Sequence, residues 1–153
     1  QLNVTSLTAL TRLVLEQMRQ RGEGKILNVS STAAFQPGPS MAVYYATKAY
    51  VLSFSEALAN ELRGTGITVS TLCPGPTKTE FQRRAGFENV LLMKSRVMSA
   101  ERVARIGYRG LQKGKKLIIP GLLNKLMVQA AVRLGPRKLV ASFVHFVQKN
   151  RTK

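Results

Sequence analysis

Two short apolar runs on either side of one long uninterrupted helical segment constrain the fold of this chain most strongly. The first run, KILNVSS, covers residues 25–31, and the second covers residues 67–73. Both are short and contain β-branched residues, as is typical of buried strands. Residues 43–63 contain no Gly or Pro, which predicts a helix that ends at Gly64 and Gly66. A strand, a helix and a strand in succession predict a parallel sheet.

The flanking segments predict further elements of the same kind. Residues 2–21 have apolar side chains at helical spacing, and residues 32–40 contain Pro37-Gly38-Pro39, which is typical of a loop. Residues 76–98 are expected to be irregular. After them, Ser99 is expected to cap a helix that ends near Gly114, and residues 116–120 are expected to form a strand.

The net charge of +17 is concentrated in the second half of the chain. Residues 1–81 hold seven Lys or Arg and five Glu, whereas residues 82–153 hold seventeen Lys or Arg and two Glu. The first half therefore has the charge balance of an enzyme core. The second half is expected to present a cationic surface that attracts anionic lipid or a phosphorylated ligand. Nucleic-acid binding is not expected, because no recognition motif accompanies the charge.

The C-terminal segment, residues 122–149, predicts two amphipathic helices split at Gly135-Pro136. Two interpretations remain open for it. The helices could lie on an anionic membrane surface, because apolar stretches alternate with Lys and Arg. Alternatively, they could pack their apolar faces on the sheet and leave a basic face in solvent. His145 is expected to be packed or to lie at an interface rather than to bind a metal, because a site needs three or four ligands.

Cysteine usage and hydropathy indicate the compartment. Cys73 is the only cysteine, so no intrachain disulfide can form, and a cytoplasmic location is expected, with membrane association left open. Cys73 itself is expected to be an inert core thiol. The uncharged stretch at residues 139–148 is shorter than the roughly 20 apolar residues of a membrane span. The chain begins with Gln1 instead of Met, which we interpret as a fragment.

Polar side chains follow the predicted strands, at the edge of a parallel sheet where ligands bind. Ser31 ends the first strand, and Tyr44 and Lys48 lie four residues apart, on one face of the long helix. The ammonium group and the positive end of the helix dipole both favour the phenolate form of the tyrosine. Such a tyrosine can exchange a proton with a substrate oxygen, and the serine hydroxyl can hold that oxygen in place.

This stretch resembles the active-site region of the short-chain dehydrogenases/reductases. The family signature combines a Tyr-x-x-x-Lys on a helix, a Ser thirteen residues before that Tyr, and a Pro-Gly after the next strand. The matching elements are Tyr44 to Lys48, Ser31, and the segment Pro74-Gly75-Pro76-Thr77-Lys78-Thr79. Asn3 lies where the family has an Asn in the preceding helix. The resemblance is tight over residues 3–80 and loose beyond them.

The resemblance implies a role for each of these residues. Tyr44 is the general acid/base, Lys48 tunes it and hydrogen-bonds the nicotinamide ribose, and Ser31 orients the substrate carbonyl. Asn3 supports a water chain behind Lys48, although an ordinary solvated Asn remains an alternative. The nicotinamide carboxamide contacts the segment that contains Pro74, Gly75, Thr77 and Thr79. The two threonines could instead cap a following helix. Tyr45 is expected to pack or to line the substrate site, and Ser30 to point to the other face of the strand.

The resemblance also implies the architecture. We expect an α/β fold, a Rossmann-like doubly wound parallel sheet that is N-terminally truncated. The truncation follows from the sequence, which lacks the family's Gly-rich pyrophosphate turn and its selector between NAD and NADP. Residues 1–153 then form one partial domain: a catalytic core (1–81), a substrate lid with the last helix and strand (82–121), and a basic amphipathic tail (122–153).

The predicted activity is NAD(P)(H)-dependent oxidoreduction, in which a carbonyl is reduced or an alcohol is oxidised by hydride transfer. The preferred coenzyme is left open. The substrate is expected to be a small molecule, and apolar residues within positions 81–98 favour a lipophilic one. A homodimer is expected through the helix that contains Tyr44. The alternative function is that of an inactive fragment whose basic tail binds an anionic membrane or a protein partner.

Overall fold

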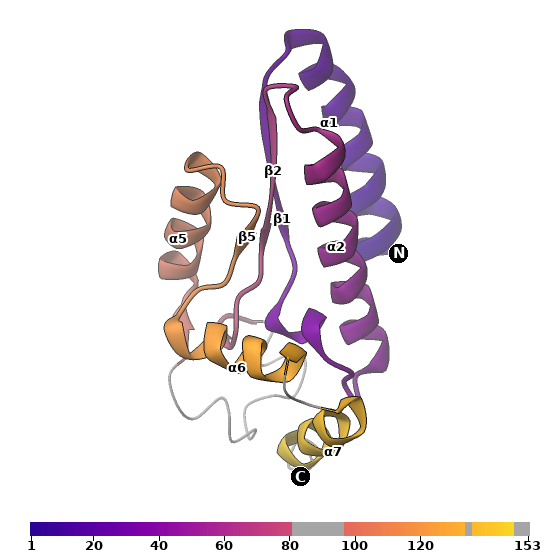
Figure 1. The fold of residues 1–153 in the computed structure, drawn as a ribbon, viewed down its shortest axis with the longest axis vertical. Helices are drawn as coiled ribbons and strands as arrows, with labels where there is room; N and C mark the ends of the chain where they lie inside the picture. The colour runs from indigo at the N-terminus through magenta and orange to yellow at the C-terminus, as the bar shows by residue number, and fades with distance from the viewer. Residues whose placement is uncertain (81–96, 134–135, 149–153) are drawn as a thin grey trace.

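A computed structural model describes residues 1–80, 97–133 and 136–148 (Figure 1). The predicted substrate lid falls largely on residues 81–96, which lie outside these ranges. The elements follow in the order η1 (Leu2–Ser6), α1 (Leu7–Arg21), β1 (Gly24–Val29), η2 (Thr32–Phe35), α2 (Ala42–Glu61), β2 (Ile67–Leu72), β3 (Thr77–Lys78), β4 (Met98–Ser99), α5 (Ala100–Gln112), β5 (Leu117–Ile118), α6 (Leu122–Arg133) and α7 (Arg137–Gln148).

Strands β1, β2 and β5 form a parallel sheet in the order β1-β2-β5. β1 pairs with β2 along its whole length, from Gly24 opposite Ile67 to Val29 opposite Leu72. Helices α1 and α2 cover one face of the sheet, and α5 covers the other (Figure 1). The predicted α/β fold with helices on both faces of a parallel sheet is therefore confirmed.

The core lies on both faces of this sheet. Towards α1 and α2 it contains Leu15, Ile26, Leu58, Ala59, Leu62, Ile67 and Val69. Towards α5 it contains Leu72, Val103 and Ile118. Two glycines let α5 approach the sheet closely, because a Cβ at Gly110 would lie 2.5 Å from the Ile118 side chain and one at Gly107 would lie 2.8 Å from that of Leu72. Close packing of this kind leaves no room for a larger residue at either position.

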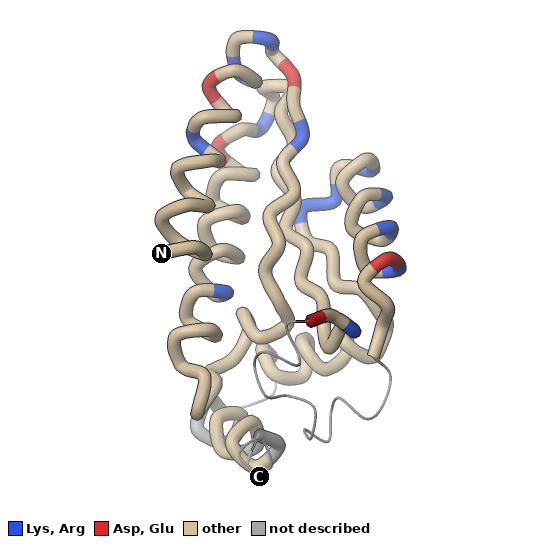
Figure 2. Tube along the Cα trace, turned by 180° about the vertical axis from the view of Figure 1, so that it is seen from behind, with Lys and Arg blue, Asp and Glu red and all other residues tan. Residues whose placement is uncertain are grey.

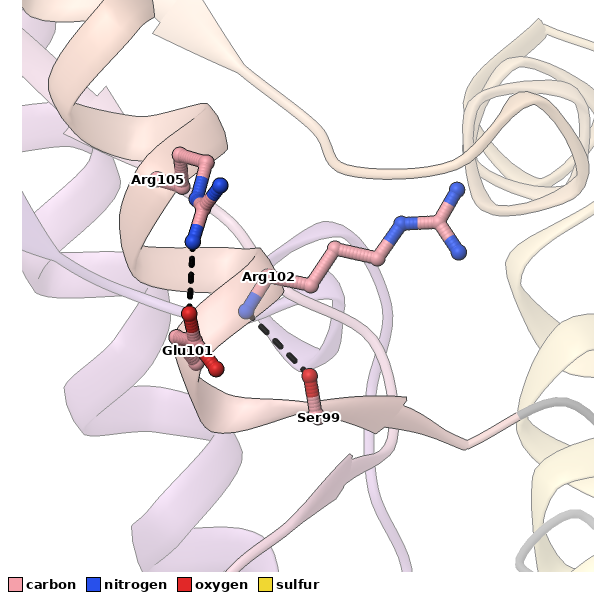
Figure 3. Close-up of polar contacts among 4 residues, drawn as sticks. All are labelled: Ser99, Glu101, Arg102 and Arg105. Atoms are coloured by element: carbon pink, nitrogen blue, oxygen red, sulfur yellow. Dashed lines mark hydrogen bonds and ion pairs between the residues drawn. The ribbon is translucent and has the colours of Figure 1, made fainter.

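The N-terminal end of α5 is capped by a side chain, as the sequence predicts. Ser99 Oγ accepts a 3.2 Å hydrogen bond from the backbone N–H of Arg102 (Figure 3). In the first turn of the helix, Glu101 forms a 2.5 Å ion pair with Arg105, which lies one turn further along. Glu101 is the only acidic residue of α5. The other charged residues of this helix, and those between the helix and β5, are Lys or Arg (Figure 2).

Some predicted boundaries were wrong. The first strand ends at Val29, and Ser30 and Ser31 follow it, because the chain turns there into the 3₁₀ helix η2. The first helix begins with a π-helical turn, η1. The segment expected to be irregular between 76 and 98 contributes β3 and β4, which form a parallel pair because the N–H of Met98 donates to the Pro76 carbonyl at 3.2 Å.

The C-terminal segment forms two helices separated near Pro136, as predicted. α6 crosses the carboxyl ends of the strands, and α7 lies beyond it at the same end of the molecule (Figure 1). Val128 of α6 is buried in a core with Leu52, Cys73 and Ile119. The packing interpretation is therefore right for this face of α6. In the ranges that the structure describes, no helix is long and apolar enough to cross a membrane.

Candidate active site

The carboxyl ends of β1 and β2 and the beginning of α2 form the candidate site. The turns after the two strands are held side by side by backbone hydrogen bonds. The N–H of Ser30 donates to the Leu72 carbonyl at 2.8 Å, and the N–H of Thr32 donates to the Pro74 carbonyl at 2.9 Å. The sheet thus brings together the two segments that the sequence predicts for the site.

Tyr44 and Lys48 lie together on α2, as their spacing predicts. Lys48 Nζ is 5.9 Å from the centroid of the Tyr44 ring, within the range of a cation–π contact. Tyr45 packs edge-on against Tyr44 with a centroid separation of 5.9 Å, in agreement with the packing role expected for it. Both tyrosines and the lysine are half-buried.

The structure anchors Lys48 to the end of β1 through both its side chain and its backbone. Lys48 Nζ donates a 3.2 Å hydrogen bond to the Val29 carbonyl, and Ser30 Oγ donates a 2.7 Å hydrogen bond to the Lys48 carbonyl. Burial lowers the pKa of the Lys48 ammonium. An ammonium group has three donors, so the bond to Val29 leaves two for a ligand.

Ser31 follows directly, in an extended conformation. Its Oγ accepts a 3.1 Å hydrogen bond from the N–H of Ala33 and caps η2. A hydroxyl can accept and donate at once, so Ser31 keeps its proton for a ligand oxygen. Ser30 is buried and bonds to α2, which agrees with its expected orientation away from Ser31.

Asn3 contacts α2 within one residue of Lys48. Its Nδ2 donates a 3.2 Å hydrogen bond to Thr47 Oγ1, and Thr47 Oγ1 donates in turn to the Tyr44 carbonyl at 2.9 Å. The structure therefore links η1 to the turn of α2 that contains Tyr44 and Lys48. Thr47 was not predicted as a site residue, because no local sequence pattern indicates a contact with Asn3, which lies 44 positions earlier.

The turn after β2 contains an internal hydrogen bond from a threonine, and α6 covers the turn. Thr77 Oγ1 donates a 2.9 Å hydrogen bond to the Gly75 carbonyl. Thr77 belongs to β3 and therefore does not cap a helix. Thr79 is exposed and directly precedes Glu80, which is helical, so the alternative that Thr79 caps a helix stays a prediction. A Cβ at Gly75 would lie 2.6 Å from Asn124 Nδ2, which shows that Asn124 packs directly on the turn. No sequence pattern pointed to Asn124.

Cys73 lies at the base of the site. It is fully buried, and burial raises the pKa of its thiol to about 12. A thiol with so high a pKa is protonated at neutral pH and is a poor nucleophile, as expected for a core cysteine. Among the residues that the structure describes, no three His, Cys, Asp or Glu side chains gather in a way that could hold a metal ion.

The donor set at this edge suits a nicotinamide nucleoside. Lys48 offers ammonium donors and Tyr44 a hydroxyl, which are the groups that hydrogen-bond ribose hydroxyls. The turn of residues 74–79 offers backbone and hydroxyl groups of the kind that bind a carboxamide. A proton donor, a cation and a hydroxyl at one edge can stabilise charge that develops on a substrate oxygen.

A family model and several known proteins match this chain. A family model described as short chain dehydrogenase matches residues 1–89. The 17-beta-hydroxysteroid dehydrogenase type 3 of Mus musculus is 47% identical over 72 residues, which cover 47% of this chain and 24% of that protein. The very-long-chain 3-oxoacyl-CoA reductase of Rattus norvegicus is 45% identical over 73 residues, which cover 48% and 23% respectively.

Solved structures share the fold over most of the chain. A short-chain dehydrogenase from Sphingobium yanoikuyae in complex with NADPH has a TM-score of 0.72 and 33% identity, with 86% of this chain and 52% of that chain covered. A 7beta-hydroxysteroid dehydrogenase has a TM-score of 0.80 at 24% identity, over 93% of this chain and 55% of that chain. The chain thus spans about a quarter of these curated relatives and about half of these solved chains.

Proposed function

The chain belongs to the short-chain dehydrogenase family, and we propose that it acts as an NAD(P)(H)-dependent oxidoreductase on a carbonyl or alcohol. The observation that supports this most is the arrangement of Tyr44 and Lys48. The two residues share one face of α2, and Lys48 is tied to the end of β1 through Val29 and Ser30. The alternative of an inactive chain is not proposed, because this arrangement is what proton transfer to a substrate oxygen needs.

In this proposal each residue either takes part in the proton transfer or positions the groups that do. Tyr44 gives its proton to the substrate oxygen when a ketone is reduced and takes it back when an alcohol is oxidised. Lys48 stabilises the phenolate that forms after the transfer, because its ammonium lies over the Tyr44 ring. Ser31 donates its hydroxyl proton to the same oxygen. Asn3 holds the first turns of α2 through Thr47.

The cofactor would be NAD or NADP, which supplies the hydride. Lys48 and Tyr44 would hold its ribose, and the turn containing Pro74, Gly75, Thr77 and Thr79 would hold its carboxamide. Relatives of known structure support both coenzymes: the Sphingobium yanoikuyae enzyme is described with NADPH. A 3-ketoacyl-(acyl-carrier-protein) reductase of Brucella melitensis, with a TM-score of 0.61 and 25% identity, is described with NADH.

We propose a lipophilic carbonyl compound as the substrate. The relatives named for hydroxysteroids and for very-long-chain 3-oxoacyl-CoA support this class, and so does the apolar composition of the predicted lid. The whole protein's substrate and activity remain proposals. A cytoplasmic location likewise remains a prediction from the cysteine content.

A homodimer through the α1–α2 face is part of the proposal. Exposed apolar side chains on this face include Leu10, Leu13 and Val14 of α1 and Val43 and Tyr50 of α2. An exposed apolar patch on a helix pair is typical of an interface between protein chains. Thr8 and Tyr50, whose hydroxyl oxygens are 2.8 Å apart, hold the two helices in register for such a contact.

Titration with NADH and NADPH tests the cofactor half of the proposal. We expect saturable binding that Lys48→Ala weakens at least about tenfold, because the ribose loses charge-assisted hydrogen bonds. Lys25→Ala is the matched control: Lys25 lies at the opposite end of β1, bonds to Gln112, and should not affect binding. No binding at millimolar coenzyme, or equal weakening by the two variants, would contradict the proposed site.

A carbonyl-reduction assay tests the proton-transfer half. Tyr44→Phe should lower kcat by about 10²- to 10⁴-fold, the usual contribution of general acid catalysis, with coenzyme binding largely retained. Tyr45→Phe is the matched control, because the two rings are neighbours on α2 and only Tyr44 is assigned the proton transfer. A Tyr44→Phe variant with unchanged kcat would rule out this role.

A further inference from the structure

The two C-terminal helices expose a set of apolar side chains that the fold does not use. On α6, Leu122, Leu123 and Leu126 are exposed, and on α7, Leu139 and Phe146 are exposed. We call these five residues the outer tail surface. Leu122 and Phe146 keep 74% and 72% of their surface in contact with solvent. Large apolar side chains exposed on two consecutive helices are a feature of interaction sites.

This surface faces away from the body of the molecule. On α6, Asn124 and Val128 pack inwards, against Gly75 and against the core with Cys73. Leu122 and Leu126 are one turn apart on the opposite side of the helix. On α7, Val144 is buried, whereas Leu139 and Phe146 are two turns apart on another side. Each of the two helices thus has a second apolar side, beyond the one that it buries.

The charge around this surface identifies the kind of partner. From residue 122 to the end, the sequence contains seven Lys or Arg and no Asp or Glu. A second copy of the chain would bring the same positive charge to the contact, which opposes self-association there. Apolar side chains flanked by cations on a helix pair too short to span a bilayer suit the boundary of an anionic membrane. We propose that the outer tail surface docks on an anionic lipid bilayer.

Docking would have a consequence for the active site, and this step rests on the proposed function. α6 crosses the carboxyl ends of the strands (Figure 1), and Asn124 touches the turn at Gly75. A bilayer under α6 would therefore lie at the end of the sheet near which α2 presents Tyr44 and Lys48. A lipophilic carbonyl compound dissolved in that bilayer can reach the site without crossing water, which would raise its local concentration.

Tryptophan fluorescence can locate the contact, because the chain contains no Trp. Phe146→Trp and Leu126→Trp each introduce one emitter on the outer tail surface. Tyr108→Trp is the matched control, because Tyr108 is 62% exposed but lies on α5. On adding phosphatidylcholine vesicles with about 30% phosphatidylserine, the first two variants should shift their emission to shorter wavelength and lose access to an aqueous quencher. The control should do neither.

Co-sedimentation with the same vesicles measures the affinity. We expect binding that falls with salt, that is lost with pure phosphatidylcholine, and that the double change Leu122→Gln/Leu126→Gln weakens by about tenfold or more. Tyr108→Gln should bind as the parent chain does. These side chains are exposed, so their replacement should not disturb the fold, which a thermal melt verifies.

Three outcomes would overturn the docking proposal. The first is an absence of vesicle binding at physiological salt. The second is an equal emission shift in the Tyr108→Trp variant, which would indicate adsorption through the cations of α5. The third is a loss of self-association, measured by light scattering without vesicles, in the Leu122→Gln/Leu126→Gln variant, which would assign the surface to a second copy. Vesicle binding needs no coenzyme, so its failure is distinct from failure of the oxidoreductase proposal.

Discussion

The hydroxyl of Ser30 donates a 2.7 Å hydrogen bond to the backbone carbonyl of Lys48. In the other direction, Lys48 Nζ donates to the carbonyl of Val29, the residue before Ser30, at 3.2 Å. Two consecutive residues at the end of β1 therefore hold one residue of α2. This double contact sets the position of the ammonium relative to the strand end.

Removing the Ser30 hydroxyl should loosen this contact. We expect Ser30→Ala to lower the free energy of unfolding by about 1 kcal/mol, the usual net value of a buried hydrogen bond, and to weaken coenzyme binding. Denaturant unfolding and coenzyme titration measure the two effects. Ser31→Ala is the comparison: it removes the cap of the short helix η2 and also the hydroxyl that is proposed to bind the substrate oxygen, so it should affect reduction of the substrate more than stability. The reverse ranking in stability would contradict this assignment.

Cys73 should make the protein sensitive to alkali. Its folded-state pKa of about 12 lies above the ordinary value of 9.0, so the unfolded chain loses the thiol proton first. The stability contributed by the protonated thiol is fully present below pH 9.0 and is lost as the pH rises towards 12. Above the lower value the loss is about 1.4 kcal/mol per pH unit.

Cys73→Ala tests this pH dependence. The variant will be less stable at pH 8, because a buried side chain has been shortened. Between pH 8 and pH 10, however, it should lose about 1 kcal/mol less than the parent chain. Denaturant unfolding at the two pH values measures the difference, and parallel losses would show that the thiol is not involved.

Substitutions of Gly75 and Asn124 should have coupled effects on the free energy of unfolding. Gly75→Ala places a methyl group about 2.6 Å from Asn124 Nδ2, closer than van der Waals contact allows. We expect a destabilisation of about 1–3 kcal/mol, as for other overpacked sites. In the Asn124→Ala background the same change should cost much less, because the obstructing amide is gone. A double-mutant cycle by thermal unfolding measures the coupling, and additive effects would mean that α6 does not press on the turn.

Thr71 offers a stabilising substitution. Its Oγ1 is buried on β2 and finds no hydrogen-bond partner within the described part of the chain. A buried hydroxyl without a partner costs free energy, and valine has nearly the same shape without the polar atom. We therefore expect Thr71→Val to raise the free energy of unfolding by about 1 kcal/mol. Asn28→Ala, at the position paired with Thr71 in β1, should destabilise instead, because it removes the bond to Ser55.

Most helices and strands, and the part of the site that lies within α2, were predictable from local sequence patterns. Helix and strand follow from the spacing of apolar residues and from Gly and Pro at the ends, which are properties of short segments. The contact between Tyr44 and Lys48 is of the same kind, because side chains four residues apart on a helix are neighbours in any fold. The cap at Ser99 likewise depends only on residues within one turn.

The tertiary structure alone decided which distant segments meet at the site. Asn3 meets Thr47, and Asn124 meets Gly75, through contacts that no local pattern encodes. The end of β1 at Val29 also depends on the neighbouring turn at Pro74, to which the chain bonds after leaving the strand. The two interpretations of the tail could not be separated in sequence for the same reason. An amphipathic pattern shows that a helix has an apolar side, but only packing shows that α6 buries Val128 and leaves Leu126 exposed.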